Sequence, residues 1–193
     1  TGNTLEIDNK YIMSPKDLCT ILFMDKIIDA GVTVFKIEGR ARSAEYVKTV
    51  ARCYRDAADA VLAGKYTPEY ASELKERLST VFNRGFWDGY YQGARLGEWS
   101  EVYGNKATKS KKYIGKVTNY FSNIGVAEIL IETGSISVGD NVIIIGPSTG
   151  VVEVTVEEIR VDLKSTESAV KGEYCSIAVP EKLRRSDKLY LFQ

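Results

Sequence analysis

The sequence predicts an α+β protein with two domains, a partial α/β domain followed by a small antiparallel β-barrel. Two features of the 193 residues support this prediction. Apolar residues follow helical spacing up to Phe82, and strand-like alternation begins at Tyr113. A stretch rich in glycine and lysine lies between the two patterns. We therefore expect domains at residues 1–95 and 112–193, joined by a linker at 96–111.

The first domain is predicted to consist mainly of helices. Ser14-Pro15 is typical of a helix start, with a capping residue and a proline at the first helical position, and the apolar spacing continues to Ile28. A second helix is predicted from about Ala44 to Leu62, and a third begins at Thr67-Pro68. Short extended pieces are expected earlier, at Thr4–Ile7 and Tyr11–Met13.

The segment Val32–Glu38 has the alternation of a β-strand. In such a strand Lys36 and Glu38 share one face, opposite Phe35 and Ile37. Burying two charges is costly unless they meet each other or a ligand. Because one strand among helices cannot make a complete sheet, this half is predicted to be the end of a larger α/β domain.

A candidate anion-binding site lies at the end of this strand. In parallel α/β folds, ligands bind where strands end and helices begin. Arg40 and Arg42 stand at that point, and the planar fork of arginine suits carboxylate or phosphate. Lys36 would add a point charge. The alternative is a structural pair of Lys36 with Glu38 and two solvated arginines.

The composition excludes several kinds of site. The chain has 26 basic and 26 acidic residues, so no global field attracts nucleic acid or a membrane. It has no histidine, which excludes Ser–His or Cys–His catalysis and His-ligated zinc within this chain. The apolar runs are too short for a membrane span. Three scattered cysteines indicate a reducing, cytoplasmic setting.

Two stretches near the linker each allow two interpretations. Phe82–Tyr91 is dense in aromatic residues and glycine, and with Arg84 it could stack nucleobases. The alternative, which we favour, is a packed surface that joins the domains. Lysines at positions 106, 109, 111 and 112 form either a solvated linker or a hinge that contacts phosphate.

The second domain is predicted to be a small closed antiparallel barrel, because short alternating segments are separated by turn signals with no helix between them. Asn141–Ile145 is almost entirely apolar and is therefore expected to be a central strand. The six predicted strands are Tyr113–Phe121, Gly125–Glu132, Asn141–Ile145, Val151–Val161, Glu173–Val179 and Lys188–Phe192.

Two motifs, I-M-S-P-K-D-L-C at Ile12–Cys19 and F-K-I-E-G-R-A-R-S-A-E-Y-V at Phe35–Val47, resemble peptidase family U32, the collagenase-like proteins. Tyr54-Arg55 and N-R-G-F at Asn83–Phe86 fit the same family. The resemblance implies the last part of a TIM-barrel-like domain followed by a small β-barrel. That barrel is also similar to the second domain of elongation factor Tu, at Gly115-Lys116-Val117, Ile136–Asp140 and Gly172.

The resemblance implies a role in RNA base hydroxylation, on the wobble uridine of tRNA or on rRNA, with the β-barrel as an accessory docking domain. The alternatives are a collagenase-like peptidase and a non-catalytic module that binds RNA or protein. The full-length protein is expected to be the enzyme, with RNA or a peptide as its partner and no membrane. The fragment alone is expected to be inactive and to bind no cofactor, although some relatives hold an iron–sulfur cluster.

The candidate catalytic residues are Glu38 and Lys36, with Arg40, Arg42 and Lys16 binding the ligand. Glu38 is the best base for a peptidase, but no nucleophile pairs visibly with it. Cys19 is the candidate for an outlying iron–sulfur ligand, because it is expected one turn into a helix, where a thiolate is favoured. A buried core thiol is the alternative for this cysteine.

Overall fold

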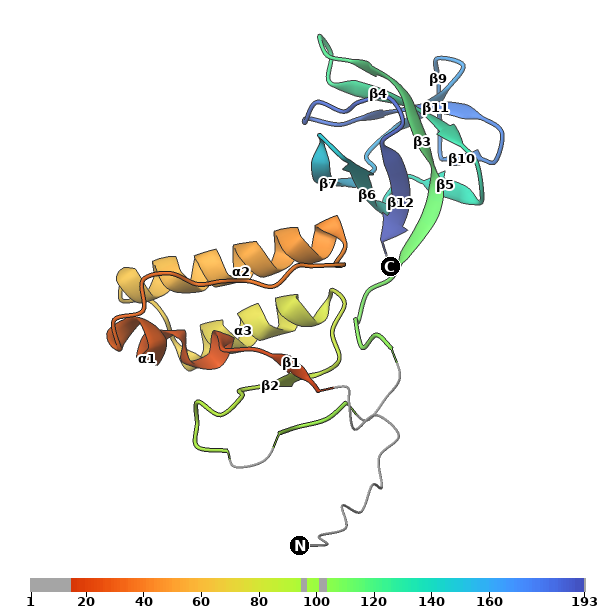
Figure 1. The fold of residues 1–193 in the computed structure, drawn as a ribbon. Helices are drawn as coiled ribbons and strands as arrows, with labels where there is room; N and C mark the ends of the chain where they lie inside the picture. Colours follow the sequence, from red (N-terminus) through yellow and green to blue (C-terminus); the bar gives the residue numbers. More distant parts are fainter. Residues whose placement is uncertain (1–14, 95–96, 101–103, 193) are drawn as a thin grey trace, which may run out of the picture. The chain divides into compact units, whose positions relative to one another are not determined.

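The computed structural model describes residues 15–94, 97–100 and 104–192 (Figure 1). The chain divides into two compact units, Thr1–Thr108 (unit 1) and Lys109–Gln193 (unit 2). The extended pieces expected at 4–7 and 11–13 lie outside the described residues.

The two longest helices of unit 1 were both predicted. The longer one, α2 (Ala44–Leu62), follows Ser43 in extended conformation, and α3 (Pro68–Ser79) is capped by Thr67, whose side chain accepts a hydrogen bond from the Tyr70 N–H at 3.2 Å. Their facing apolar side chains are buried in one core, which includes Val50, Cys53, Ala57, Leu74 and Leu78.

No helix in the described part of the chain is long and apolar enough to cross a membrane.

The N-terminal helix begins later than the sequence predicts. It consists of a 3₁₀ turn, η1 (Ile21–Phe23), and a short helix, α1 (Met24–Asp29). The residues before it form β1 (Asp17–Leu18), which runs parallel to β2 (Phe86–Trp87). The Asp17 N–H donates to the Gly85 carbonyl at 2.8 Å, and the Cys19 N–H donates to the Trp87 carbonyl at 2.9 Å. Long-range pairing therefore overrides the local helix signal at Ser14-Pro15.

The prediction of a β-strand at Val32–Glu38 is wrong, because this segment belongs to no sheet. Within the described part of unit 1 the only strands are β1 and β2, which pair with each other. An extended segment with no neighbouring strand cannot form a ladder. The side chain of Val34 is 82% exposed, and Lys36 and Glu38 are exposed as well. The alternative of a buried structural pair between Lys36 and Glu38 is therefore excluded.

Unit 2 contains two antiparallel sheets. Its strands are β3 (Lys111–Phe121), β4 (Val126–Ile131), β5 (Ser135–Ser137), β6 (Asn141–Gly146), β7 (Gly150–Thr155), β8 (Ile159–Val161), β9 (Lys164–Thr166), β10 (Ser168–Val170), β11 (Tyr174–Ala178) and β12 (Lys188–Phe192). Eight of them form one sheet in the order β7-β6-β12-β3-β4-β11-β8-β9, and β5 pairs with β10.

The antiparallel pairing agrees with the prediction. The predicted closure of the sheet into a barrel is not found in the strand pairing. No ladder joins the end strands β7 and β9 among the described residues, so strand pairing leaves the sheet open. The predicted strand Val151–Val161 is divided into β7 and β8, because the Val156 N–H and carbonyl bond instead to Asp140 and Gly139. The three-residue strands β5, β9 and β10 were missed because so few residues give no clear alternation.

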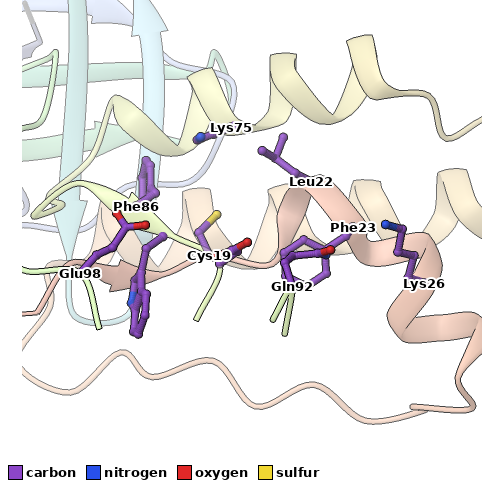
Figure 2. Close-up of a pocket in the computed structure, with 10 residues that line it drawn as sticks. Cys19, Leu22, Phe23, Lys26, Lys75, Phe86, Gln92 and Glu98 are labelled. Carbon is purple, nitrogen blue, oxygen red and sulfur yellow. The ribbon is translucent and has the colours of Figure 1, made fainter. Parts of the chain in front are cut away.

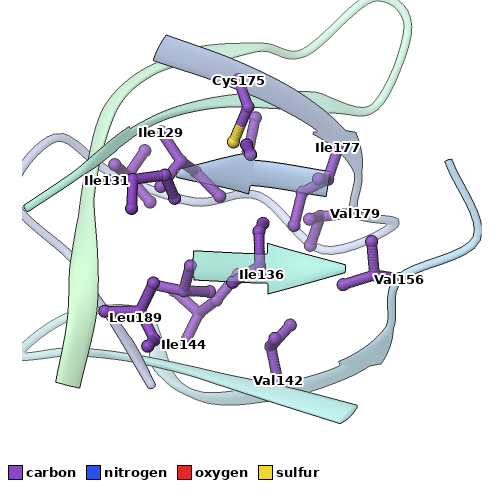
Figure 3. Packing of buried hydrophobic residues seen from close by; sticks show 14 of the residues in the cluster. Ile129, Ile131, Ile136, Val142, Ile144, Val156, Cys175, Ile177, Val179 and Leu189 are labelled. Carbon is purple, nitrogen blue, oxygen red and sulfur yellow. The ribbon is translucent and has the colours of Figure 1, made fainter. Parts of the chain in front are cut away.

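The core of unit 2 is formed by the side chains that point inward from several strands (Figure 3). As predicted, β6 is a central strand, between β7 and β12, and Val142, Ile143 and Ile144 in it are all buried. Burying one such side chain contributes ~1.5–3 kcal/mol. The cluster includes Ile129, Ile131, Ile136, Val142, Ile144, Cys175, Ile177 and Leu189.

Gly115 allows β3 and β4 to approach closely. A Cβ atom at this position would lie 2.0 Å from the Leu130 carbonyl oxygen, which is backbone and cannot turn aside as a side chain would. The position therefore requires glycine because of the neighbouring strand, not because of its own φ angle.

We expect Gly115→Ala to destabilise unit 2 by roughly 1–3 kcal/mol, because the added methyl group overlaps the Leu130 carbonyl. Both tryptophans, Trp87 and Trp99, belong to unit 1. In urea unfolding, the β-sheet signal in circular dichroism should therefore shift to lower urea while the tryptophan fluorescence transition stays in place. Lys164→Ala on exposed β9 is the control, and a Gly115→Ala protein as stable as this control would contradict the close approach.

Candidate functional site

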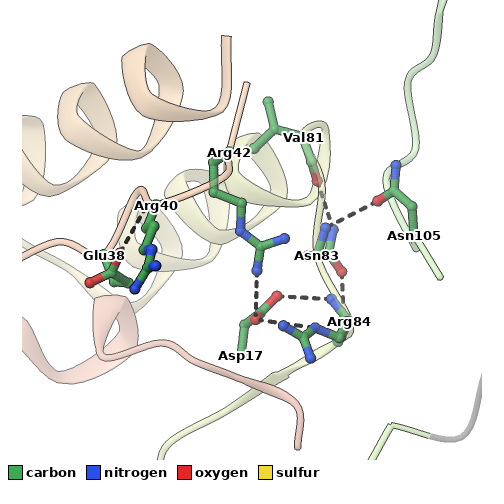
Figure 4. Close-up of polar contacts among 9 residues, drawn as sticks. Asp17, Glu38, Arg40, Arg42, Val81, Asn83, Arg84 and Asn105 are labelled. Carbon is green, nitrogen blue, oxygen red and sulfur yellow. Dashed lines mark hydrogen bonds and ion pairs between the residues drawn. The ribbon is translucent and has the colours of Figure 1, made fainter. Parts of the chain in front are cut away.

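One carboxylate joins three parts of unit 1 (Figure 4). Asp17 Oδ2 accepts a hydrogen bond from the Arg84 backbone N–H at 2.9 Å. Asp17 Oδ1 lies 3.4 Å from Arg42 Nη2 and 3.9 Å from Arg84 Nε. Only about a fifth of the Asp17 side chain is exposed (21%), and Arg42 is exposed to 17%. The residue thereby ties β1 to the start of α2 and to the loop before β2.

Two further sets of contacts hold this arrangement in place. The Arg42 guanidinium lies 4.2 Å from the Phe82 ring centre and 5.2 Å from that of Tyr46. Asn83 is buried, and its side-chain amide donates to the Val81 carbonyl at 2.9 Å while its oxygen accepts from the Gly85 N–H at 3.1 Å. The loop that carries Arg84 is therefore fixed by its own hydrogen bonds.

A cavity of about 900 Å³ lies beside this cluster. Four basic side chains line it, and Asp17 and Glu38 are the acidic residues on its wall. The aromatic part of the wall includes Tyr46 and Tyr54, and burial raises the pKa of both phenols. A wall of cations and neutral phenols suits a ligand with an anionic group and a planar ring. The basic residues are Lys36, Arg40, Arg42 and Arg84.

The structure brings most of the predicted site residues together. Lys36, Glu38, Arg40 and Arg42 all line the 900 Å³ cavity. The Glu38 carboxylate accepts a hydrogen bond from the Arg40 N–H at 2.8 Å, so it turns back on its own loop. Lys16 lies elsewhere, since its ammonium pairs with Glu98 at 2.6 Å.

Sequence reasoning missed Asp17 and the two tyrosines as site residues, and it considered Arg84 only as part of the aromatic stretch Phe82–Tyr91. Asp17 looked like the acidic residue in the first turn of a helix, which explained it without any long-range partner. The signal that could have revealed it is a pair of arginines inside two of the quoted motifs, Arg42 in Phe35–Val47 and Arg84 in Asn83–Phe86. Two partly buried cations require a carboxylate between them.

A second cavity, of about 470 Å³, opens next to Cys19 (Figure 2). Phe86 and Trp87 contribute apolar surface, and Lys75 from α3 and Glu98 contribute charge. Cys19 is not one turn into a helix, as expected, because it directly follows β1 and lies two residues before η1. Burial raises the pKa of its thiol, although the Ile21 N–H acts in the opposite direction.

The three thiols of the chain do not gather into a metal site among the described residues, and Cys19 as an outlying ligand of an iron–sulfur cluster stays a prediction. Cys19, Cys53 and Cys175 are all buried and free. Burial raises the pKa of each thiol, for Cys175 to about 12. Within the residues that the structure describes, no three histidine, cysteine or acidic side chains are grouped so that they could hold a metal ion.

Comparison with known proteins finds some relatives that are named as collagenases and others that are named as tRNA hydroxylation proteins. Residues 1–101 match Peptidase family U32. The chain is 57% identical over 192 residues to "Collagenase" of Porphyromonas gingivalis, which covers 100% of the chain and 46% of that protein. It is 32% identical over 155 residues to "tRNA hydroxylation protein P1" of Bacillus subtilis, which covers 80% of the chain and 36% of that protein. The chain thus spans less than half the length of these two relatives.

Among solved structures, the chain is similar to the C-terminal domain of a Geobacillus thermoleovorans protein described as a U32 peptidase. The match covers 40% of this chain and 89% of that one, with 19% sequence identity and a TM-score of 0.39.

We expect Asp17→Ala to destabilise unit 1 by about 1.5–3 kcal/mol, because the hydrogen bonds it accepts involve a charged group and two arginines would lose their shared partner. Tryptophan fluorescence during urea unfolding measures this. Asp59→Ala is the matched control, since Asp59 pairs with Arg55 on an exposed face of α2, where little stability depends on the pair. Equal effects of the two substitutions would contradict the role assigned to Asp17.

The three thiols of the native chain should react slowly with a disulfide reagent at about pH 8, because burial raises their pKa and leaves little thiolate. In concentrated urea all three should react at the rate of a free thiol. Cys19→Ser is the diagnostic variant: loss of a fast-reacting thiol in this variant would mean that the 470 Å³ cavity exposes Cys19 to solvent, contrary to expectation.

Proposed function

The chain belongs to peptidase family U32, and on that premise we propose that it is the C-terminal part of a protein that acts in RNA base hydroxylation. Unit 1 would be the end of a larger TIM-barrel-like α/β domain, and unit 2 would be an accessory docking domain. The names of relatives such as tRNA hydroxylation protein P1 support an RNA substrate.

The observation that carries the proposal is the cavity of about 900 Å³ with its four basic residues and its tyrosines. A nucleotide offers a phosphate to the cations and a base to the aromatic rings. Arg42 is held between Asp17 and two aromatic rings, so it is already in place before a ligand arrives. Lys36 and Arg40 are exposed at the cavity wall and can adjust to the ligand.

The role proposed for this chain is to bind and orient the RNA. The cysteines that the structure describes are buried and are not grouped into a metal site, so no oxidation step is assigned to them. An iron–sulfur cluster in the full-length protein remains a proposal that rests on the family resemblance.

A collagenase-like peptidase is the second candidate, and the name of the P. gingivalis relative supports it. Peptide hydrolysis requires an activated nucleophile, a pair of carboxylates or a metal. Glu38 is exposed and accepts a hydrogen bond from a neighbouring N–H, and the chain has no histidine to act as a base. The 900 Å³ cavity therefore offers cations for binding rather than groups for hydrolysis.

The proposal is tested with Lys36→Gln combined with Arg40→Gln in the full-length protein. These exposed side chains contact the proposed ligand, so we expect the hydroxylated nucleoside to fall roughly tenfold, equivalent to ~1.4 kcal/mol of binding. The measurement is mass spectrometry of nucleosides from a deletion strain that carries each variant. Arg52→Gln with Lys65→Gln removes the same charge from exposed positions outside the cavity and should restore the modification fully.

The deletion strain itself decides between the two candidate functions. If its RNA keeps every hydroxylated base while the full-length protein cleaves a collagen peptide, the RNA proposal is wrong and the peptidase is supported. If the deletion abolishes hydroxylation of a base but the variant with Lys36→Gln and Arg40→Gln restores it fully, the 900 Å³ cavity is not the RNA site.

A further inference from the structure

We propose that the 470 Å³ cavity beside Cys19 binds a single nucleotide, with the base against its aromatic wall and the phosphate against its lysines. The volume lies in the range of small-molecule sites, about 300–1,000 Å³. The choice of RNA as the source of this nucleotide rests on the proposed function, which it deepens by adding a pocket for one base. A free mononucleotide has the same chemistry and is the other source.

The apolar part of the cavity wall comes mainly from β2. Phe86 and Trp87 both line the cavity and are half-buried, and Leu22 of η1 is 46% exposed there. The Trp87 ring meets that of Tyr90 edge to face at 5.3 Å, and the Trp87 carbonyl accepts a hydrogen bond from the Cys19 N–H at 2.9 Å. Accessible aromatic side chains stack on nucleobases. β2 therefore offers a stacking surface that is already held in place.

Two lysines from different helices supply positive charge to this cavity. Lys75 extends from α3 and Lys26 from α1 (Figure 2). Among the described residues, neither lysine is in an ion pair. Burial raises the pKa of the Cys19 thiol while the Lys75 ammonium acts in the opposite direction, so this ammonium lies near the thiol. Both lysines are therefore available to a phosphate.

The acidic residues on the wall do not cancel this charge. The Glu98 carboxylate is already paired with Lys16 Nζ at 2.6 Å. Asp88 is the other acidic residue on the wall, so two lysines stand against one carboxylate that has no such partner. The excess is a single positive charge. It suits an anion of low charge, such as one phosphate of a nucleic-acid chain.

Gln92 and Asp88 provide groups that can recognise the edge of a base. The side-chain amide of Gln92 has a donor and an acceptor side by side, and the Asp88 carboxylate accepts from an N–H. Base edges carry donors and acceptors in the same arrangement, and an amide pairs with them through two hydrogen bonds. A ring without such an edge would leave both groups without a partner. The cavity therefore favours a nucleotide among anions that carry a ring.

One short segment separates this cavity from the larger one. Leu18 and Thr20 line the 900 Å³ cavity, whereas Cys19 and Leu22 line the 470 Å³ cavity. The Tyr54 hydroxyl contacts both walls, because it accepts from the Thr20 N–H at 3.0 Å and lies 3.9 Å from Cys19 Sγ. Enzymes that act on a base take it out of the stack into a pocket. The smaller cavity would hold this base while the neighbouring nucleotides contact the larger one.

The test measures binding of uridine monophosphate to the whole 193-residue chain with Trp99→Phe. Trp87 is then the only tryptophan, and it lines the 470 Å³ cavity but not the 900 Å³ cavity, so its fluorescence reports on the smaller one. Lys75→Gln should raise Kd about tenfold, because a charged hydrogen bond to phosphate is lost. Lys65→Gln removes the same charge from an exposed position outside both cavities and should leave Kd nearly unchanged.

A second variant tests recognition of the base. Gln92→Leu keeps apolar bulk and removes the amide, and it should raise Kd for uridine monophosphate about 5- to 150-fold. Phenyl phosphate has a ring and a phosphate but no base edge, so it should bind the parent chain and this variant equally. Gln92 is exposed, so the substitution leaves the core intact.

Each outcome supports or overturns the proposal. If uridine monophosphate leaves the Trp87 fluorescence unchanged, or if Lys75→Gln and Lys65→Gln have equal effects, the cavity is not a nucleotide site. Equal weakening of both ligands by Gln92→Leu would overturn recognition of the base. If Lys75→Gln loses its helical circular dichroism, Lys26→Gln takes its place, since Lys26 is exposed and should act in the same direction.

A single-stranded oligouridylate of about six nucleotides distinguishes the two sources. If RNA is the source, this oligonucleotide should change the Trp87 fluorescence at lower concentration than uridine monophosphate does, and Lys75→Gln should weaken its binding too. If it has no effect while uridine monophosphate binds, RNA is overturned as the source and a free nucleotide is supported. No measurement depends on hydroxylation, so failure here is distinct from failure of the proposed function.

Discussion

Parallel pairing of β1 with β2 is the interaction on which unit 1 depends, because it joins segments that are far apart in the chain. Asp17 accepts a hydrogen bond from the Arg84 N–H across 67 positions and also pairs with Arg42 at the start of α2. A partly buried carboxylate between two arginines is stable only when all three are held together. The wall of the 900 Å³ cavity follows from this arrangement, since Arg42 and Arg84 belong to it.

In unit 2 the corresponding constraint is the density of the core. Inward side chains from several strands fill one cluster, and Gly115 lets β3 and β4 approach at a distance that no side chain would permit. The same alternation that sends Leu189 inward sends Tyr190 outward, so packing of the core also determines which rings lie on the surface.

In the 900 Å³ cavity of unit 1, cations lie beside aromatic rings. This combination matches a nucleotide, which has an anionic backbone and a planar base. A peptide substrate would not require both features, and the described residues near Glu38 offer no nucleophile with a base. The cations and aromatic rings of the 900 Å³ cavity are therefore the features on which the proposed RNA substrate rests.

The sequence by itself determined α2, α3 and the strands that are long enough to show alternation, because caps and periodic apolar residues act locally. It also identified Lys36, Arg40 and Arg42, which line one cavity. Only the tertiary structure decided that Asp17 lies in a strand rather than a helix, and that Val32–Glu38 pairs with no other strand. Both depend on partners that are distant in the chain, and hydrogen bonds between distant segments leave no local pattern in the amino-acid sequence.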